Sequence, residues 1–162
     1  MLSFFALVVS GIAILLAHPR FYWGETGSVG APSLIDLPLP FVLTGQTGWG
    51  RSLHFLSAWI CVANGIVYLL AKPRYAIYDR LQRSAYAAVV FALFPLIIWT
   101  GLAMSPAITS VFPAIVTSLG GRQSARTIHF FVADTLLLFL LAHIVMVIRS
   151  RHLRAMIVGT NG

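Results

Sequence analysis

The chain of 162 residues contains five histidines, and two of them lie in one apolar run, RQSARTIHFFVADTLLLFLLAHIVMVIR, at residues 122–149. These two are His129 and His143. A polar side chain is expensive inside an apolar run of this length, so its presence there needs a chemical reason. A neutral imidazole is a good axial ligand for haem iron, and coordination offsets the cost of burying it. Histidine-ligated iron is therefore the candidate chemistry.

The spacing of His129 and His143 fits two sites rather than one. On an α-helix, residues 14 apart are separated by about 21 Å along the axis and by roughly 40° around it. The two histidines therefore share one helix face, one near the outer end of the helix and one near the inner end. We expect two ligand sites stacked across a bilayer.

His54 is well placed to complete the outer site. It lies in the first turn of another apolar run, at the depth that we expect for His129. Ala58 and Gly65 follow on the face of His54, and Ala133 lies one turn below His129. Small side chains on these faces leave room for a flat macrocycle.

Two arginines accompany the outer site. Arg51 and Arg126 each lie three residues before a proposed ligand, where a guanidinium could pair with a haem propionate. Zinc or copper is the main chemical alternative, but such sites usually include nearby cysteine or carboxylate ligands. The sequence places none beside His54 or His129.

The inner histidine, His143, has no evident histidine partner in the sequence. One explanation is that the numbered chain lacks an N-terminal turn or two that carries the second ligand. The first apolar run, of 16 residues, would then be short for the same reason. The alternatives are a ligand from another subunit, a weak ligand such as Met1, a single-haem protein, or a hydrogen-bonding role for His143.

The composition is that of a membrane protein, with 59% hydrophobic and 9% charged residues. Runs at 52–71, 84–104 and 128–148 are each long enough to cross about 30 Å of hydrocarbon. We expect an all-α fold, an integral membrane four-helix bundle with haem between its helices. The helices are predicted at about 2–18, 51–71, 84–104 and 124–149, with Ser124 as an N-cap. They form a single membrane domain over residues 1–162.

The loops predict how the chain is oriented. The outer loop, 19–50, is rich in glycine, proline and aromatic residues, whereas the inner loop, 72–83, is short and basic. By the positive-inside rule the inner loop and both termini face the cytoplasm, and the first run is a retained helix rather than a signal peptide. The net charge of +7 therefore indicates membrane topology and not a nucleic-acid partner.

The histidine pattern, together with the stretches HPRFYWGETG, FPLIIWTGLAMSP and GGRQSARTIHFF, resembles the bacterial di-haem cytochrome b family. Its members include the membrane subunits of nickel-iron hydrogenases, formate dehydrogenases and thiosulfate reductases. The three stretches look like a subgroup found beside molybdopterin oxidoreductases. The similarity covers essentially the whole chain.

This resemblance implies electron transfer in the bacterial cytoplasmic (inner) membrane, between the quinone pool and an extracytoplasmic redox protein, here one that contains molybdopterin. By motif position, His54 and His129 would bind the outer haem b, and His143 would bind one side of an inner haem. The family's remaining inner ligand, commonly a His-Trp pair early in the first helix, is absent from this sequence.

Two other functions remain open: a stand-alone quinone-linked oxidoreductase, such as a superoxide oxidase, and a structural anchor whose histidines only form hydrogen bonds. Asp134 points away from the histidine face, where it could form an interhelical hydrogen bond or take up protons. We expect His18 at the membrane interface or in a quinone pocket rather than on iron.

Overall fold

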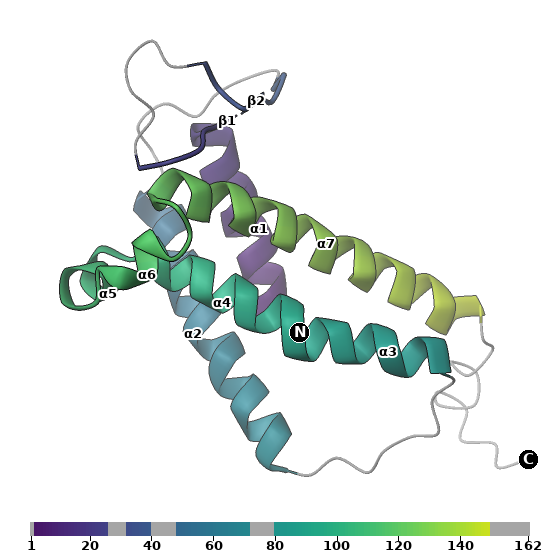
Figure 1. The fold of residues 1–162 in the computed structure, drawn as a ribbon. Helices are drawn as coiled ribbons and strands as arrows, with labels where there is room; N and C mark the ends of the chain where they lie inside the picture. The colour runs from purple at the N-terminus through teal and green to yellow at the C-terminus, as the bar shows by residue number, and fades with distance from the viewer. Residues whose placement is uncertain (1, 26–31, 40–47, 72–79, 150–162) are drawn as a thin grey trace, which may run out of the picture. The chain divides into compact units, whose positions relative to one another are not determined.

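The computed structural model describes residues 2–25, 32–39, 48–71 and 80–149 (Figure 1). The chain divides into two compact units. The first unit comprises Met1–Phe21 and Pro32–Tyr78, and the second comprises Tyr22–Ala31 and Asp79–Gly162. Helices make up most of the described residues and the strands are two residues long, which confirms the all-α class.

The first unit is built on two helices that pack together, α1 (Leu2–Ala17) and α2 (Gly48–Leu70). Small residues line their contact. Ser10 and Ala13 of α1 are buried, and a Cβ placed on Gly50 would lie only 3.5 Å from the Cβ of Ala13. Small residues let helix backbones approach closely, and this packing holds the start of α2 against the middle of α1.

A small hairpin follows α1. The helix ends before His18-Pro19, because a proline disfavours the helical conformation of the residue before it. Strand β1 (Arg20–Phe21) then pairs antiparallel with β2 (Ile35–Asp36), and Arg20 Nε lies 3.1 Å from Asp36 Oδ2. Part of the segment expected to be an outer loop is therefore ordered as strands, and α2 begins at Gly48, ahead of the expected residue 51.

The second unit is built on two long helical rods. One consists of α3 (Arg80–Ala88), the π-helical turn η1 (Val89–Leu93) and α4 (Phe94–Ala103), and it packs against α7 (Arg122–Arg149). Figure 1 shows the teal rod running beside the green α7. Pro95 lies just after the π turn. A proline cannot donate to the carbonyl four residues before it, and a wider turn is a common local response to such a loss.

Two short helices connect these rods: α5 (Pro106–Val111) and α6 (Ala114–Thr117). The buried side chains of α6 form a small core with the ends of the rods. This core consists of Ala103, Ile115, Val116 and Ala125. It fixes the end of α4 against the beginning of α7.

Glycines and one serine join residues 22–25 to the start of α7. Gly24 N–H donates to Ser124 Oγ at 2.8 Å, and Ser124 Oγ donates in turn to the Gly120 carbonyl at 3.2 Å. Helix α7 begins at Arg122, so Ser124 lies in its first turn rather than at the expected N-cap. The serine oxygen satisfies a backbone donor of another segment instead of one in its own helix.

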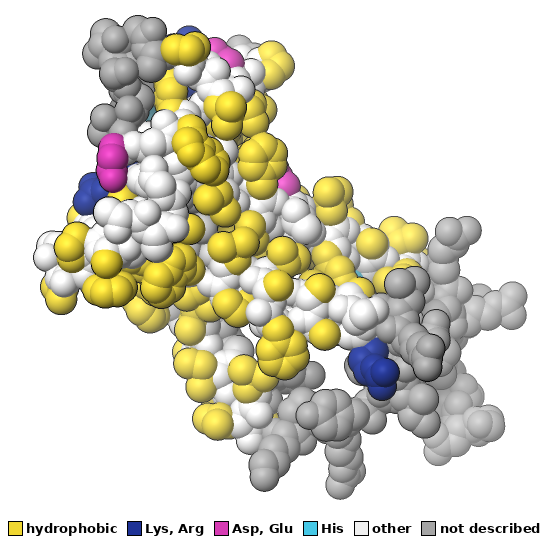
Figure 2. All heavy atoms as spheres, viewed as in Figure 1, with side chains coloured by type: hydrophobic (Ala, Val, Ile, Leu, Met, Phe, Trp, Pro, Cys, Tyr) yellow, Lys and Arg dark blue, Asp and Glu magenta, His cyan; other side chains and the backbone are white. Residues whose placement is uncertain are grey.

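The described helices suit a lipid environment. Residues Gln82–Ala103 and Arg122–Ile148 are each long and apolar enough to cross a membrane. The 23 residues of α2 would span about 34 Å at 1.5 Å per residue. Large apolar side chains such as Leu70, Phe91 and Leu138 are exposed along these helices, and Figure 2 shows how such side chains cover one face. The protein is an all-α membrane protein, as the composition predicted.

Candidate functional site

His54 lies in the second turn of α2, where its ring faces Ser10 of α1. Ser10 Oγ lies 3.0 Å from His54 Nδ1 and 2.6 Å from the carbonyl oxygen of Ala6, one turn earlier in α1. A hydroxyl has one proton to donate. With that proton donated to the Ala6 carbonyl, the Ser10 oxygen can accept a hydrogen bond from His54 Nδ1–H. Ser10 is fully buried, at 0% exposure.

His129, in the second turn of α7, makes the same kind of contact in the second unit. Thr100 Oγ1 of α4 lies 2.9 Å from His129 Nδ1 and donates to the Leu96 carbonyl at 2.8 Å. The threonine hydroxyl therefore also acts as an acceptor for the imidazole N–H, and it too is 0% exposed. In both units the hydroxyl contacts Nδ1, and a proton held on Nδ1 leaves the lone pair of the neutral imidazole on Nε2.

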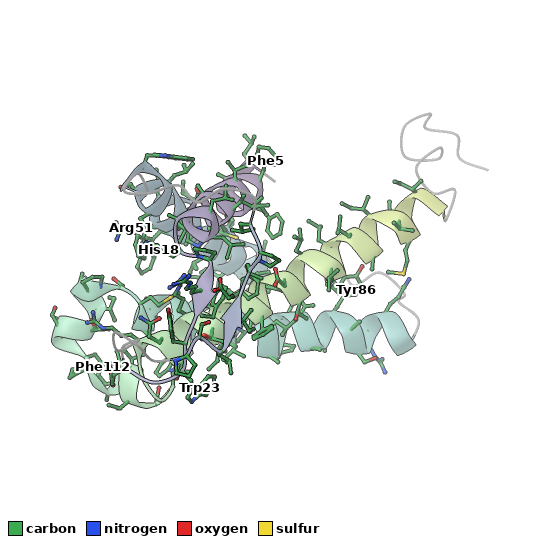
Figure 3. All side chains as sticks on the ribbon, turned by 90° about the horizontal axis from the view of Figure 1, so that it is seen from above. Phe5, His18, Trp23, Arg51, Tyr86 and Phe112 are labelled. Carbon is green, nitrogen blue, oxygen red and sulfur yellow. The ribbon has the colours of Figure 1, made fainter. Side chains whose placement is uncertain are left out.

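His143 lies in the same helix as His129, 14 residues on. The hydroxyl of Tyr86, from α3, lies 2.7 Å from His143 Nδ1. The Tyr86 ring also meets the imidazole edge-on, with ring centroids 5.8 Å apart, and Phe139 lies next to both rings. Figure 3 labels Tyr86 where α3 runs beside α7. A hydrogen-bonding role for His143, one of the alternatives that the sequence leaves open, therefore corresponds to an actual contact, which is compatible with ligation through Nε2.

The small residues expected beside the macrocycle differ in their solvent exposure. Gly65 is exposed, and a Cβ added to it would meet no heavy atom within 4 Å. Ala133 is exposed and Ala58 is partly buried. Arg51 is exposed at the start of α2, and Arg126 is partly buried in the first turns of α7. Of these small residues, Gly65 and Ala133 are therefore exposed in their own units.

The structure does not bring every predicted residue together. His54 belongs to the first unit, whereas His129 and His143 belong to the second, so their pairing at iron stays a prediction. His18 is exposed after the end of α1, and Asp134 is partly buried in α7. His152 and most of the basic inner loop lie outside the described residues.

Sequence reasoning missed the three hydroxyl partners of the histidines: Ser10, Thr100 and Tyr86. A signal for two of them was present. Ser10-Gly11-Ile12-Ala13 in α1 and Thr100-Gly101-Leu102-Ala103 in α4 share one short pattern of a hydroxyl residue, glycine, an aliphatic residue and alanine. Each copy places its hydroxyl against a histidine of the neighbouring helix.

Comparison with known proteins settles the family. A family model described as prokaryotic cytochrome b561 matches residues 1–159 of the chain. The chain belongs to this family. The resemblance inferred from the histidine pattern is confirmed, and the protein is an integral membrane cytochrome that binds haem b.

A curated relative and the solved structures complete the comparison. The chain is 27% identical over 186 residues to the "Putative protein-methionine-sulfoxide reductase subunit YedZ1" of Azospira oryzae. The match covers 94% of this chain and 86% of that protein. No solved structure matches the chain.

The histidine contacts fit the cofactor of a cytochrome b561. Axial ligation of haem needs an unprotonated imidazole nitrogen, and a ligating histidine usually donates its other N–H to a carbonyl, a carboxylate or water. Nδ1 of His54 and Nδ1 of His129 each contacts a buried hydroxyl that can act as this acceptor. Bound haem supplies one-electron redox chemistry, while the residues of the chain hold the ring nitrogens in place and exclude water.

Proposed function

We propose that this cytochrome is the electron-transfer subunit of a membrane oxidoreductase and relays electrons between the quinone pool and an extracytoplasmic, molybdopterin-containing partner. Family membership supports the electron-transfer role, and the printed name of the relative supports a role as a subunit of a reductase. The single observation that carries the proposal is that Nδ1 of His54 and Nδ1 of His129 each lies within 3.0 Å of a buried hydroxyl, which can accept its proton.

In this proposal His54 and His129 are the axial ligands of the outer haem b. His143 is an axial ligand of an inner haem whose other ligand is still to be identified. Arg51 and Arg126 pair with propionates of the outer haem, and the open faces at Ala58, Gly65 and Ala133 receive the macrocycle. Iron ligands about 21 Å apart along α7 would span most of the hydrocarbon thickness, as transmembrane electron transfer requires.

The proposed location is the bacterial cytoplasmic membrane, with both termini on the cytoplasmic side. The excess of lysine and arginine at 72–83 and after residue 148 supports this orientation through the positive-inside rule. It places the ends of α2 and α7 that carry His54 and His129 at the outer surface. A soluble partner could then exchange electrons with the outer haem, and quinone would be the diffusible substrate within the membrane.

The function can be tested in membrane vesicles that contain the cytochrome. A quinol should reduce its haem b, and an added extracytoplasmic partner should reoxidise that haem only when His54 and His129 are intact. Thr135→Val is a suitable control, because this hydroxyl bonds only to the Phe131 carbonyl of its own helix among the described contacts. Failure of quinol to reduce the haem would contradict the quinone link.

The same experiment separates the alternative function. A stand-alone superoxide oxidase would catalyse the quinone-dependent oxidation of superoxide without any added protein. A subunit should instead need its partner and should co-purify with it. Full turnover by the purified chain alone would therefore overturn the subunit proposal while leaving the cytochrome assignment intact.

A further inference from the structure

The two units repeat one local arrangement around their proposed haem ligands. In the first unit, Ser10 and Ala13 of α1 face His54 and Gly50 of α2. Ser10 and Ala13 are both buried, at 0% and 7% exposure. The histidine is four residues after the small residue, so both lie on the face of α2 that meets α1.

The second unit contains the corresponding residues in the same order. Thr100 and Ala103 of α4 face His129 and Ala125 of α7, and Ala103 and Ala125 belong to one buried core. Thr100, Ala103 and Ala125 are all at 0% exposure. A small residue again precedes the histidine by four positions, which lets the two helices approach closely enough for the hydroxyl to reach the ring.

The glycine after each hydroxyl residue contributes to this proximity. A Cβ added to Gly11 would lie 3.8 Å from His54 Cε1, and one added to Gly101 would lie 3.5 Å from His129 Cε1. The edge of each imidazole therefore lies directly against a neighbouring helix. Contact along this edge, together with the bond at Nδ1, restricts the rotation of the ring.

The surroundings of the hydroxyl are the same at both places. Each hydroxyl lies within donating distance of a carbonyl of its own helix, which leaves its oxygen able to accept from the imidazole. A donor in its place would move the imidazole proton to Nε2 and block ligation there. A hydroxyl that can accept from Nδ1–H suits ligation through Nε2, and it is present at both places. A side chain that only fills space between two helices would not need this hydrogen-bonding capacity.

We propose that Ser10 and Thr100 are equivalent positioning residues, which fix the Nδ1–H tautomer and ring orientation of His54 and His129 and thereby set the redox potential of the outer haem. This inference rests on the proposed ligand role of the two histidines. A hydrogen bond donated from Nδ1–H increases electron density on Nε2. A more basic ligand favours ferric over ferrous iron, so these hydroxyls lower the midpoint potential.

The test compares Ser10→Ala and Thr100→Val with the unchanged protein, each purified with its bound haem. Matched controls are Ser110→Ala and Thr135→Val, since these hydroxyls also bond to a carbonyl of their own helix and, among the described residues, do not bond to a histidine. Thr100→Ser is the conservative variant, because it keeps the acceptor. The readouts are the midpoint potential by spectroelectrochemical titration and the haem retained per chain.

Ser10→Ala and Thr100→Val should each raise the midpoint potential, whereas the two controls and Thr100→Ser should stay close to the unchanged protein. Loss of such supporting contacts typically weakens metal binding by about 10- to 100-fold. If the substitution weakens the binding of ferric haem tenfold more than the binding of ferrous haem, the midpoint potential rises by about 59 mV for this one-electron couple. Haem retention should fall in the same two variants.

A second measurement does not depend on the variants folding. In the reduced, unchanged protein, ¹⁵N-labelled histidine should show Nδ1-bonded protons on His54 and His129 that exchange slowly with solvent. Unprotonated Nδ1 atoms would overturn the inference, as would well-folded Ser10→Ala and Thr100→Val variants with unchanged potentials. Retention of the haem after substitution of His54 or His129 would instead contradict the proposed ligand set. That outcome is distinct from a failure of the positioning role of Ser10 and Thr100.

Discussion

At the scale of single residues, the function depends on how each histidine is held. Hydroxyl side chains from neighbouring helices contact Nδ1 of His54, His129 and His143 at 2.7–3.0 Å. Serine and threonine hold the two proposed outer ligands, whereas a phenol holds His143. The tyrosine side chain is bulkier than serine or threonine and forms additional aromatic contacts. The inner histidine should therefore depend on Tyr86 for packing as well as for its hydrogen bond.

Tyr86→Phe tests this dependence. The substitution keeps the ring contacts with Phe139 and His143 but removes the hydroxyl, which leaves a partly buried imidazole nitrogen without that partner. We expect a loss of about 1–3 kcal/mol in stability, measured by thermal unfolding in detergent. The spectrum of the outer haem should not change. An altered outer-haem spectrum would show that the effect is not local to His143.

The arginine assignment is tested by Arg126→Ala. A nearby cation favours the less positive, ferrous state of haem. Its removal should therefore lower the midpoint potential of the outer haem, by an amount that corresponds to roughly 1 kcal/mol in the free energy of reduction. Arg122→Ala is the matched control, because its guanidinium bonds to Thr109 Oγ1 at 2.9 Å. Equal shifts in the two variants would argue against a specific propionate contact for Arg126.

At the scale of helices and turns, the start of α7 is positioned by a close backbone contact. A Cβ on Gly121 would overlap the backbone of Gly24 and Glu25, and Gly121 has a φ of 119°. Gly24 has a φ of 100° but open space around its Cβ position. The two glycines therefore separate the effect of a clash from the effect of backbone conformation.

Gly121→Ala should destabilise the protein by about 3 kcal/mol or more, because it adds steric overlap to an unfavourable backbone conformation. Gly24→Ala should cost only about 1–2 kcal/mol, from the backbone conformation alone. Thermal unfolding of both variants, with haem content measured alongside, gives the comparison. Similar losses for the two would contradict the close contact between residues 24–25 and Gly121.

Much of the helix pattern could be predicted from the sequence, because long apolar runs are a direct signal. The proposed ligands could be selected by depth and spacing along two of these runs. The hydroxyl partners could not, because a serine or threonine in an apolar helix usually bonds to its own backbone, as Thr135 does. Only the packing of a second helix shows that Ser10 and Thr100 also accept from a histidine.

At the scale of the whole molecule, the proposed function requires the histidine-bearing end of α2 to face outward. Cys61 is the single cysteine of the chain, so its replacement gives a background for site-specific labelling. Asp36 of β2 is half exposed, at 52% of its side chain, and is expected on the outer side. Arg83, in α3, is exposed and is expected near the cytoplasmic surface.

An impermeant maleimide added to intact spheroplasts should label Asp36→Cys but not Arg83→Cys, each introduced after Cys61→Ala. Lysed membranes should give labelling at both positions. Because charge asymmetry across the loops sets orientation, this result would support cytoplasmic termini. Labelling of only Arg83→Cys in intact cells would reverse the topology and would move the proposed outer haem to the cytoplasmic side.

The most direct test of the central claim is the number of haems bound per chain, measured on purified protein from the reduced minus oxidised spectrum and a protein assay. The account predicts that His54→Ala and His129→Ala each abolish the same haem signal, while His18→Asn leaves it unchanged. His143→Ala should spare that signal and affect only a second haem. Retention of the outer haem in either His54→Ala or His129→Ala would contradict the account.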